Sequence, residues 1–179
     1  MRLRGLALSV LLATLAFAPA VADAASGFAA AGSMADARAS QRATLLSSGE
    51  VLVTGGRNAS GVLASAELFD PGSNTFSAAG SMADARYGQT ATLLSSGKVL
   101  VTGGFDASFT VLATAELYDP VSNTFSAAGS MAGARAFQTA TLLSSGKVLV
   151  TGGSDAGSAV ATAELFTPAT TAAATGIDF

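Results

Sequence analysis

Short apolar stretches separated by glycine and polar residues dominate the sequence after residue 40. In the middle of the chain such stretches lie at residues 90–94, 98–102, 112–118 and 124–128. Ser-Ser-Gly, Gly-Gly and Asp-Pro segments fall between them, and these are residues that turns favour. The second stretch reads Lys-Val-Leu-Val-Thr, which is typical of a strand covered on both faces. The pattern therefore predicts short strands joined by turns, without a sustained amphipathic helix.

The four-stretch pattern occurs three times in near-identical form. Its most uniform part begins Ala-Thr-Leu-Leu, ends Val-Leu-Val-Thr-Gly-Gly, and lies at residues 43–56, 91–104 and 140–153. The period is 48 to 49 residues, judged from Gly-Gly pairs that start at positions 55, 103 and 152, and a period near 50 is typical of propeller blades. We therefore predict an all-β fold of about three four-stranded antiparallel blades, either an incomplete ring or half of a two-chain propeller. The blades are expected at about residues 41–79, 90–128 and 138–166.

Several residues recur once per repeat. They are the Gly-Gly pairs Gly55 and Gly56, Gly103 and Gly104, and Gly152 and Gly153, the glutamates Glu67, Glu116 and Glu164, and the arginines Arg38, Arg86 and Arg135. A catalytic site needs different roles at different positions, whereas a residue supplied by every blade is explained by a contact made in every blade, such as an Arg to Glu pair. We interpret all of these residues as scaffold. No helix pattern follows the Gly-Gly pairs, so they do not predict a phosphate-binding loop.

The N-terminal region has the pattern of a secretory signal peptide. Two arginines precede an apolar run over residues 6–17, and Ala22-Asp23-Ala24 fits the A-x-A cleavage pattern. The run is too short for a bilayer-spanning helix, which needs about 20 apolar residues. We therefore expect residues 1–24 to be removed near Ala24, and residues 25–179 to form a secreted or periplasmic repeat domain.

Composition excludes several classes of function. The 179 residues include no cysteine and no histidine, so the fold depends on burial and backbone hydrogen bonds without disulfides. Histidine-dependent triads are excluded for the same reason, and no metal or other cofactor is expected. Loss of the leader removes Arg2, Arg4 and Asp23 from nine basic and twelve acidic residues, which leaves seven and eleven. A net negative charge argues against nucleic acid as a partner.

The order of certain residues within each repeat resembles a known family. Gly103-Gly104, Tyr118 and Phe125 follow one another in the middle repeat, and Gly55-Gly56, Phe69 and Phe76 do so in the first. This order is similar to that of the kelch family, whose blades carry Gly-Gly after the second strand, then tyrosine, then tryptophan. The resemblance covers essentially all of residues 25–179, although phenylalanine replaces the tryptophan. It implies a β-propeller.

The repeats look most like bacterial exported kelch proteins, some of which are similar to the central propeller of galactose oxidase. Those relatives often carry histidine where this sequence has Gln41, Gln89 and Gln138. The oxidase resemblance would require a copper site with histidine ligands and a cysteine-linked tyrosine, and imidazole is a usual ligand for other transition metals as well. Copper-oxidase chemistry is therefore excluded by composition.

The variable loops of the repeats supply the candidate binding residues. Because antiparallel strands alternate in direction, the uniform Ser-Ser-Gly and Asp-Pro turns share one end of each blade, and the variable loops share the other. Loops on a rigid scaffold commonly carry binding, although loops also vary without any ligand. The candidates are Arg57, Asn58, Tyr87, Asp106, Phe109, Phe137 and Asp155.

These observations favour a non-catalytic binding module for a protein or a glycan, with no residue assigned a catalytic role. One alternative is a carboxylate-dependent glycan hydrolase that uses Asp106, Asp155 and the repeated glutamates, since such enzymes need two suitably spaced carboxyl groups. Another is a structural fragment of a larger propeller with no activity of its own.

The last repeat lacks the aromatic residue of its fourth strand. The N-terminal segment 28–34 matches residues 125–131 of the middle repeat, so residues 28–31 are expected to act as a spare fourth strand. Propellers typically have about four to eight blades, and the edges of an open piece promote aggregation unless they are paired. We therefore expect either an incomplete open piece or a homodimer that completes a six-blade ring, in which Phe28 would complete a blade of the partner chain.

Overall fold

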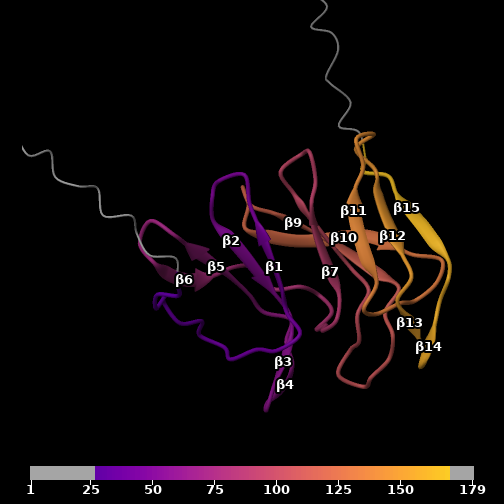
Figure 1. The fold of residues 1–179 in the computed structure, drawn as a ribbon, viewed down its shortest axis with the longest axis horizontal. Coiled ribbons are helices and arrows are strands. Elements are labelled where there is room, and N and C mark those ends of the chain that lie inside the picture. Colours follow the sequence, from indigo (N-terminus) through magenta and orange to yellow (C-terminus); the bar gives the residue numbers. More distant parts are fainter. Residues whose placement is uncertain (1–26, 170–179) are drawn as a thin grey trace, which may run out of the picture. The chain divides into compact units, whose positions relative to one another are not determined.

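The computed structural model describes residues 27–169, and every regular element within this range is a strand (Figure 1). Within the described range, residues 31–169 form one compact unit. None of the described residues belongs to a helix long and apolar enough to cross a membrane. The all-β prediction is confirmed.

Three consecutive antiparallel sheets form the unit, and we refer to them as blades 1, 2 and 3. Blade 1 has the order β1 (Arg42–Leu45), β2 (Val51–Thr54), β5 (Ala66–Asp70) and β6 (Thr75–Ala78). Blade 2 has the order β7 (Thr90–Leu93), β8 (Val99–Thr102), β9 (Thr114–Asp119) and β10 (Thr124–Ser130). Blade 3 has three strands within the described residues, β11 (Thr139–Leu142), β12 (Val148–Thr151) and β15 (Ala163–Phe166). The described residues do not form a closed ring.

Two short hairpins emerge from the variable loops. They are β3 (Arg57–Asn58) with β4 (Gly61–Val62), and β13 (Ser154–Asp155) with β14 (Ser158–Ala159). In blade 2 the corresponding loop has an isolated bridge between Phe105 and Val111 instead. The sequence pattern did not predict these hairpins.

The apolar core lies between neighbouring blades. Side chains alternate across a strand, so Val99 and Val101 of β8 pack in the cluster that blade 2 shares with blade 1, while Leu100 packs in the cluster shared with blade 3. All three side chains are at most 1% exposed, as the predicted two-face coverage of this strand requires. The first strands also lie side by side, because β7 contacts both β1 and β11.

The Gly-Gly pairs permit a close approach between blades. Gly103 has a φ of +64°, and a Cβ built there would overlap the carbonyl oxygen of Arg135 and lie 2.5 Å from Nε2 of Gln138. Gly55 makes the same approach to Arg86 and Gln89. Glycine is required at these positions for both the left-handed backbone and the space.

The two predictions for the N-terminal region stay predictions. The leader and its cleavage site fall outside the described residues. Residues 28–31 form no strand, and the side chain of Phe28 is fully exposed, so their role as a spare fourth strand stays a prediction for an assembled state.

Candidate binding site on the variable loops

The variable loops of the three blades lie at one end of their sheets. In each blade the strands pair antiparallel in chain order, for example Val101 with Ala91 and with Glu116. The Ser-Ser-Gly turns therefore share one end of the blades, and the segments after each Gly-Gly pair share the other. This arrangement places the candidate loops together.

Four aromatic rings from these loops are in contact. Tyr87 stacks on Phe105 with ring centroids 5.4 Å apart and meets Phe109 edge-on at 6.5 Å. Phe105 also contacts Phe137 at 5.6 Å, and the guanidinium carbon of Arg57 lies 4.9 Å from the centroid of Tyr87. We call these five residues the aromatic patch. Aromatic pairs and a cation over a ring at such distances attract one another beyond simple burial.

The patch presents apolar surface to solvent. Phe109 is 69% exposed and Phe137 is 57% exposed, whereas Tyr87 beneath them is buried. Both exposed phenylalanines have a left-handed backbone, with φ of +61° and +55°. A bulky residue rarely adopts this conformation, and such strain tends to cluster at binding sites.

The position of Phe137 shows how the patch departs from the repeat. Ser40 and Gly88 occupy the equivalent places in the other blades, and both also have positive φ. The N–H of Gly88 donates to the Ser40 carbonyl at 3.1 Å, and the N–H of Phe137 donates to the Gly88 carbonyl at 2.8 Å. The repeat therefore imposes the backbone, and only the third blade places a large ring on it. A Cβ at Gly88 would lie 2.8 Å from that ring, so glycine makes room for it.

The structure unites four of the seven predicted binding residues, namely Arg57, Tyr87, Phe109 and Phe137. The other three lie outside the patch. Oδ1 of Asn58 accepts a hydrogen bond from Ser60 N–H at 2.8 Å. Oδ1 of Asp106 accepts from the N–H groups of Ser108 and Thr110, each at 2.8 Å, and so shapes its own loop. Asp155 is exposed in β13.

Phe105 was missed by the sequence interpretation. It directly follows the second Gly-Gly pair, where the other repeats carry Arg57 and Ser154. That difference between repeats was a usable signal, because an aromatic residue stands there once only. Its backbone pairs with both Tyr87 and Val111, which fixes the ring at the centre of the patch.

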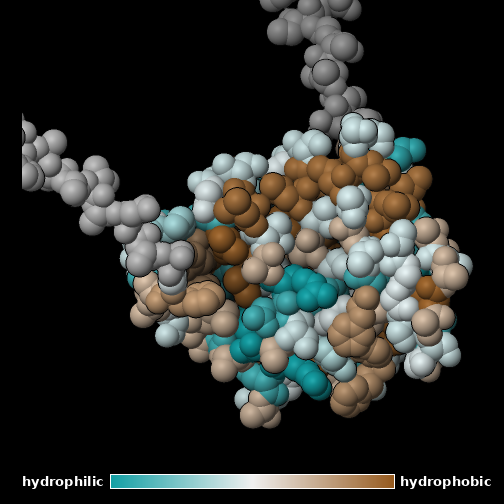
Figure 2. Space-filling model, in the orientation of Figure 1, coloured by the Kyte–Doolittle hydropathy of each residue, from teal (hydrophilic) through white to brown (hydrophobic). Residues whose placement is uncertain are grey.

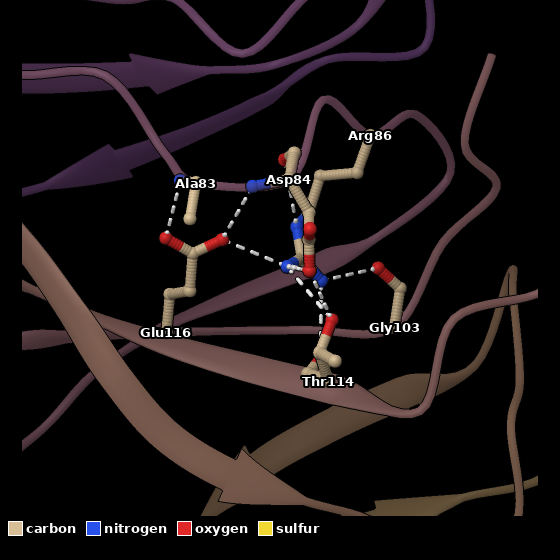
Figure 3. A network of polar contacts seen from close by, with 6 residues as sticks. All are labelled: Ala83, Asp84, Arg86, Gly103, Thr114 and Glu116. Carbon is tan, nitrogen blue, oxygen red and sulfur yellow. Dashed lines mark hydrogen bonds and ion pairs between the residues drawn. The ribbon is translucent and has the colours of Figure 1, made fainter.

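The repeated arginines and glutamates form the contact expected of a scaffold. In blade 2, Nη2 of Arg86 lies 2.8 Å from Oε1 of Glu116, and Nη1 donates to the carbonyl oxygens of Gly103 and Thr114 at 3.0 Å (Figure 3). Glu116 also accepts from the N–H of Ala83 at 2.8 Å. Both side chains are buried. The arginine thus ties the segment before each blade to the third strand of that blade.

The same pair is present in the other two blades. Arg38 lies 2.6 Å from Glu67, and Arg135 lies 2.7 Å from Glu164. Burial raises the pKa of the Glu164 carboxyl, but hydrogen bonds from Ala132 and Gly133 N–H, with the Arg135 charge, outweigh burial and set the pKa below its ordinary value. Each of these carboxylates is therefore held by an arginine and by backbone N–H groups.

Most of the described acidic residues have partners close by. Within residues 27–169, no group of three or more acidic, histidine or cysteine side chains could hold a metal ion. The repeated glutamates face arginines, and the carboxylate of Asp106 is engaged within its own loop. What the variable-loop end offers is a contact surface of aromatic rings with a neighbouring guanidinium.

A comparison with protein families supports the repeat assignment. The profile of the Kelch motif matches residues 38–83 and residues 86–132. These two segments are adjacent and together cover just over half of the chain. The chain has no match among curated proteins.

Proposed function

Because the chain belongs to the kelch-repeat family, whose repeats typically mediate protein binding, we propose that it is a binding module that recognises another protein through the aromatic patch. The observation that carries the proposal is a pair of exposed phenylalanines, of which Phe109 packs against Tyr87 and Phe137 packs against Phe105. The Arg57 guanidinium lies over the Tyr87 ring beside them. Tyrosine, arginine and other aromatic side chains are enriched at protein interfaces and often dominate their binding energy.

Several further parts of the proposal rest on the sequence. We propose that the module is non-catalytic, as kelch-repeat domains generally are, and that it is exported after loss of the leader, like the bacterial exported kelch proteins that it resembles. A glycan is the alternative ligand, since exposed aromatic rings also suit sugar faces. A homodimer that completes a six-blade ring is part of the same proposal. If the chain binds neither proteins nor glycans, the alternative is a structural fragment of a larger propeller with no activity of its own.

The test compares two exposed apolar residues at opposite ends of the blades. Phe109 belongs to the patch, while Val121 lies in the turn between β9 and β10 and is 95% exposed. A displayed peptide library and a glycan array would be screened with the purified chain, and binders would be measured against Phe109→Ala and Val121→Ala by calorimetry. We expect Phe109→Ala to raise the dissociation constant of a selected peptide about 30-fold, which is the effect of losing a hot-spot residue. Val121→Ala should leave that constant unchanged.

Circular dichroism melts of both variants would show that folding is intact. Equal weakening by both variants, or the selection of glycans alone, would overturn protein recognition by the patch. Failure of both screens would favour the fragment.

A further inference from the structure

Blades 1 and 2 are joined by a defined set of hydrogen bonds. Gly56 N–H donates to the Arg86 carbonyl at 2.9 Å, and Nε2 of Gln89 donates to the Thr54 carbonyl at 2.9 Å. Gln89 is fully buried. The Arg86 N–H in turn donates to Leu63 O at 3.2 Å.

Blades 2 and 3 are joined by the same set, one repeat later. Gly104 N–H donates to the Arg135 carbonyl at 2.9 Å, and Nε2 of Gln138 donates to the Thr102 carbonyl at 2.8 Å. The Arg135 N–H donates to Leu112 O at 3.2 Å. The contact between blades is therefore a repeated unit with a fixed direction, in which the earlier blade offers its Gly-Gly segment and the later blade offers its arginine and glutamine.

Each end of the three-blade unit carries one half of this contact. Blade 3 has the earlier-blade half, with Gly153 N–H, the Thr151 carbonyl and the Val160 carbonyl at the equivalent places, but no fourth blade follows within residues 27–169. Blade 1 has the later-blade half, with the backbone of Arg38 and the side chain of Gln41. Gln41 is partly exposed, unlike its two buried counterparts.

The apolar positions of the two outer faces are exposed in the same pattern. Leu45 of blade 1 is 63% exposed, while its equivalents Leu93 and Leu142 pack against the cores shared with the preceding blade. Leu165 of blade 3 is 53% exposed, while its equivalent Leu117 packs against the core shared with the following blade. A further apolar band crosses the first strands of all three blades, β1, β7 and β11, in the upper part of Figure 2. Both outer faces thus have the composition of buried faces.

Gly152 shows the space that a following blade would fill. A Cβ at Gly55 or Gly103 would overlap the backbone of the next blade. At Gly152, which has the same φ of +64° as Gly103, a Cβ would find only the Val160 carbonyl, at 3.7 Å, among the described residues. The place occupied by an arginine backbone and a glutamine amide in the other two contacts is open here.

We infer that the outer face of blade 3 docks on the outer face of blade 1 of a second copy, so that Gly152 and Gly153 receive Arg38 and Gln41 of that copy. The two faces differ, so the contact runs head to tail. Two copies supply six blades, within the usual range of propellers, and two equivalent contacts close the ring. The inference rests on the homodimer in the proposed function and specifies which faces meet.

Sedimentation velocity of the purified chain tests this contact with two glycine variants. Gly152→Ala places a methyl group where the Arg38 carbonyl of the second copy would lie, whereas within one chain the methyl group meets only the Val160 carbonyl, at 3.7 Å. The left-handed backbone strains an alanine at this position in the single chain and in the dimer alike. Gly146→Ala is the matched control, because Gly146 also has positive φ and a Cβ there would meet nothing within 4 Å. We expect a dimer for the native chain and for Gly146→Ala. In Gly152→Ala the added methyl group overpacks both contacts of the ring. We therefore expect the dissociation constant of the dimer to rise about 100-fold.

Each outcome of this measurement decides a separate point. A native chain that stays monomeric up to 100 μM, about a hundred times a micromolar dissociation constant, would overturn both the dimer and the contact. A dimer that survives Gly152→Ala would overturn the contact alone and leave the proposed dimer standing. If Gly152→Ala fails to fold, Gln41→Ala serves as the second variant, since loss of its amide is expected to weaken only the dimer. Binding of peptides through Phe109 is measured independently.

Discussion

The buried arginine of each blade is expected to contribute more to the stability of the fold than an exposed charge would. The guanidinium of Arg86 lies between a buried glutamate and two main-chain carbonyls. Removing one member of a buried, hydrogen-bonded ion pair leaves the other charge unpaired, which typically costs about 3–5 kcal/mol. We therefore expect Arg86→Ala to lower the free energy of unfolding by that amount, measured by urea denaturation.

A surface ion pair in the same blade is the control for this prediction. Nζ of Lys98 lies 2.9 Å from Asp119, and both side chains are partly exposed. Exposed pairs contribute about 0–1 kcal/mol, so Lys98→Ala should shift the urea midpoint only slightly. Similar losses in both variants would show that the buried pair has no special role.

Among the elements, the short loop before each first strand contributes both to the fold and to the proposed binding surface. Phe137 has a left-handed backbone that costs a bulky residue about 1–2 kcal/mol, while its ring contacts Phe105 and lies close to Gly88. In Phe137→Gly the relief of strain offsets the lost packing. We expect the melting temperature to stay within about 4 °C, equivalent to about 1 kcal/mol, while peptide binding falls about tenfold. A large drop in melting temperature would show that the Phe137 ring mainly stabilises the fold. Val121→Ala is the control, because it removes an exposed apolar side chain far from the patch and should change neither the melting temperature nor peptide binding.

The strands themselves were largely predictable because the repeat presents the same pattern three times. The third strand was placed two residues early, at Leu112 rather than Thr114. Leu112 N–H donates to the Gly104 carbonyl, and the Ala113 carbonyl accepts from Met131 N–H. These residues therefore join neighbouring segments instead of continuing the ladder, which an apolar pattern cannot distinguish.

The position of the candidate binding face was predictable, but the contacts within it were not. Repeat differences singled out the loops, and the alternation of strands placed them at one end. The contact of Phe105 with Tyr87 and Phe137 depends on the spacing between blades, which local sequence does not encode. The charged and amide candidates Asn58 and Asp106 stay predictions, and both side chains accept hydrogen bonds within their own turns.

At the scale of the whole molecule, stability and assembly are expected to be linked. The chain has no cysteine, so burial between blades is the main source of stability, and two outer faces carry exposed leucines in one copy. Anything that binds the folded state alone stabilises it by mass action, and this includes a second copy.

The unfolding temperature should therefore depend on protein concentration. For a dimer, each tenfold increase in concentration adds about 1.4 kcal/mol per dimer, which for chains of this size corresponds to about 1–3 °C. Scanning calorimetry from 2 to 200 μM, a range of about two decades chosen to span a micromolar dissociation constant, would measure this slope. Gly146→Ala should keep the slope over the whole range. Gly152→Ala should show no slope from 2 to about 20 μM, because its outer faces stay uncovered at concentrations well below its expected dissociation constant of about 100 μM. A native chain whose melting temperature is constant over this range would be stable as three blades, and the exposed leucines would then need an explanation other than a second copy.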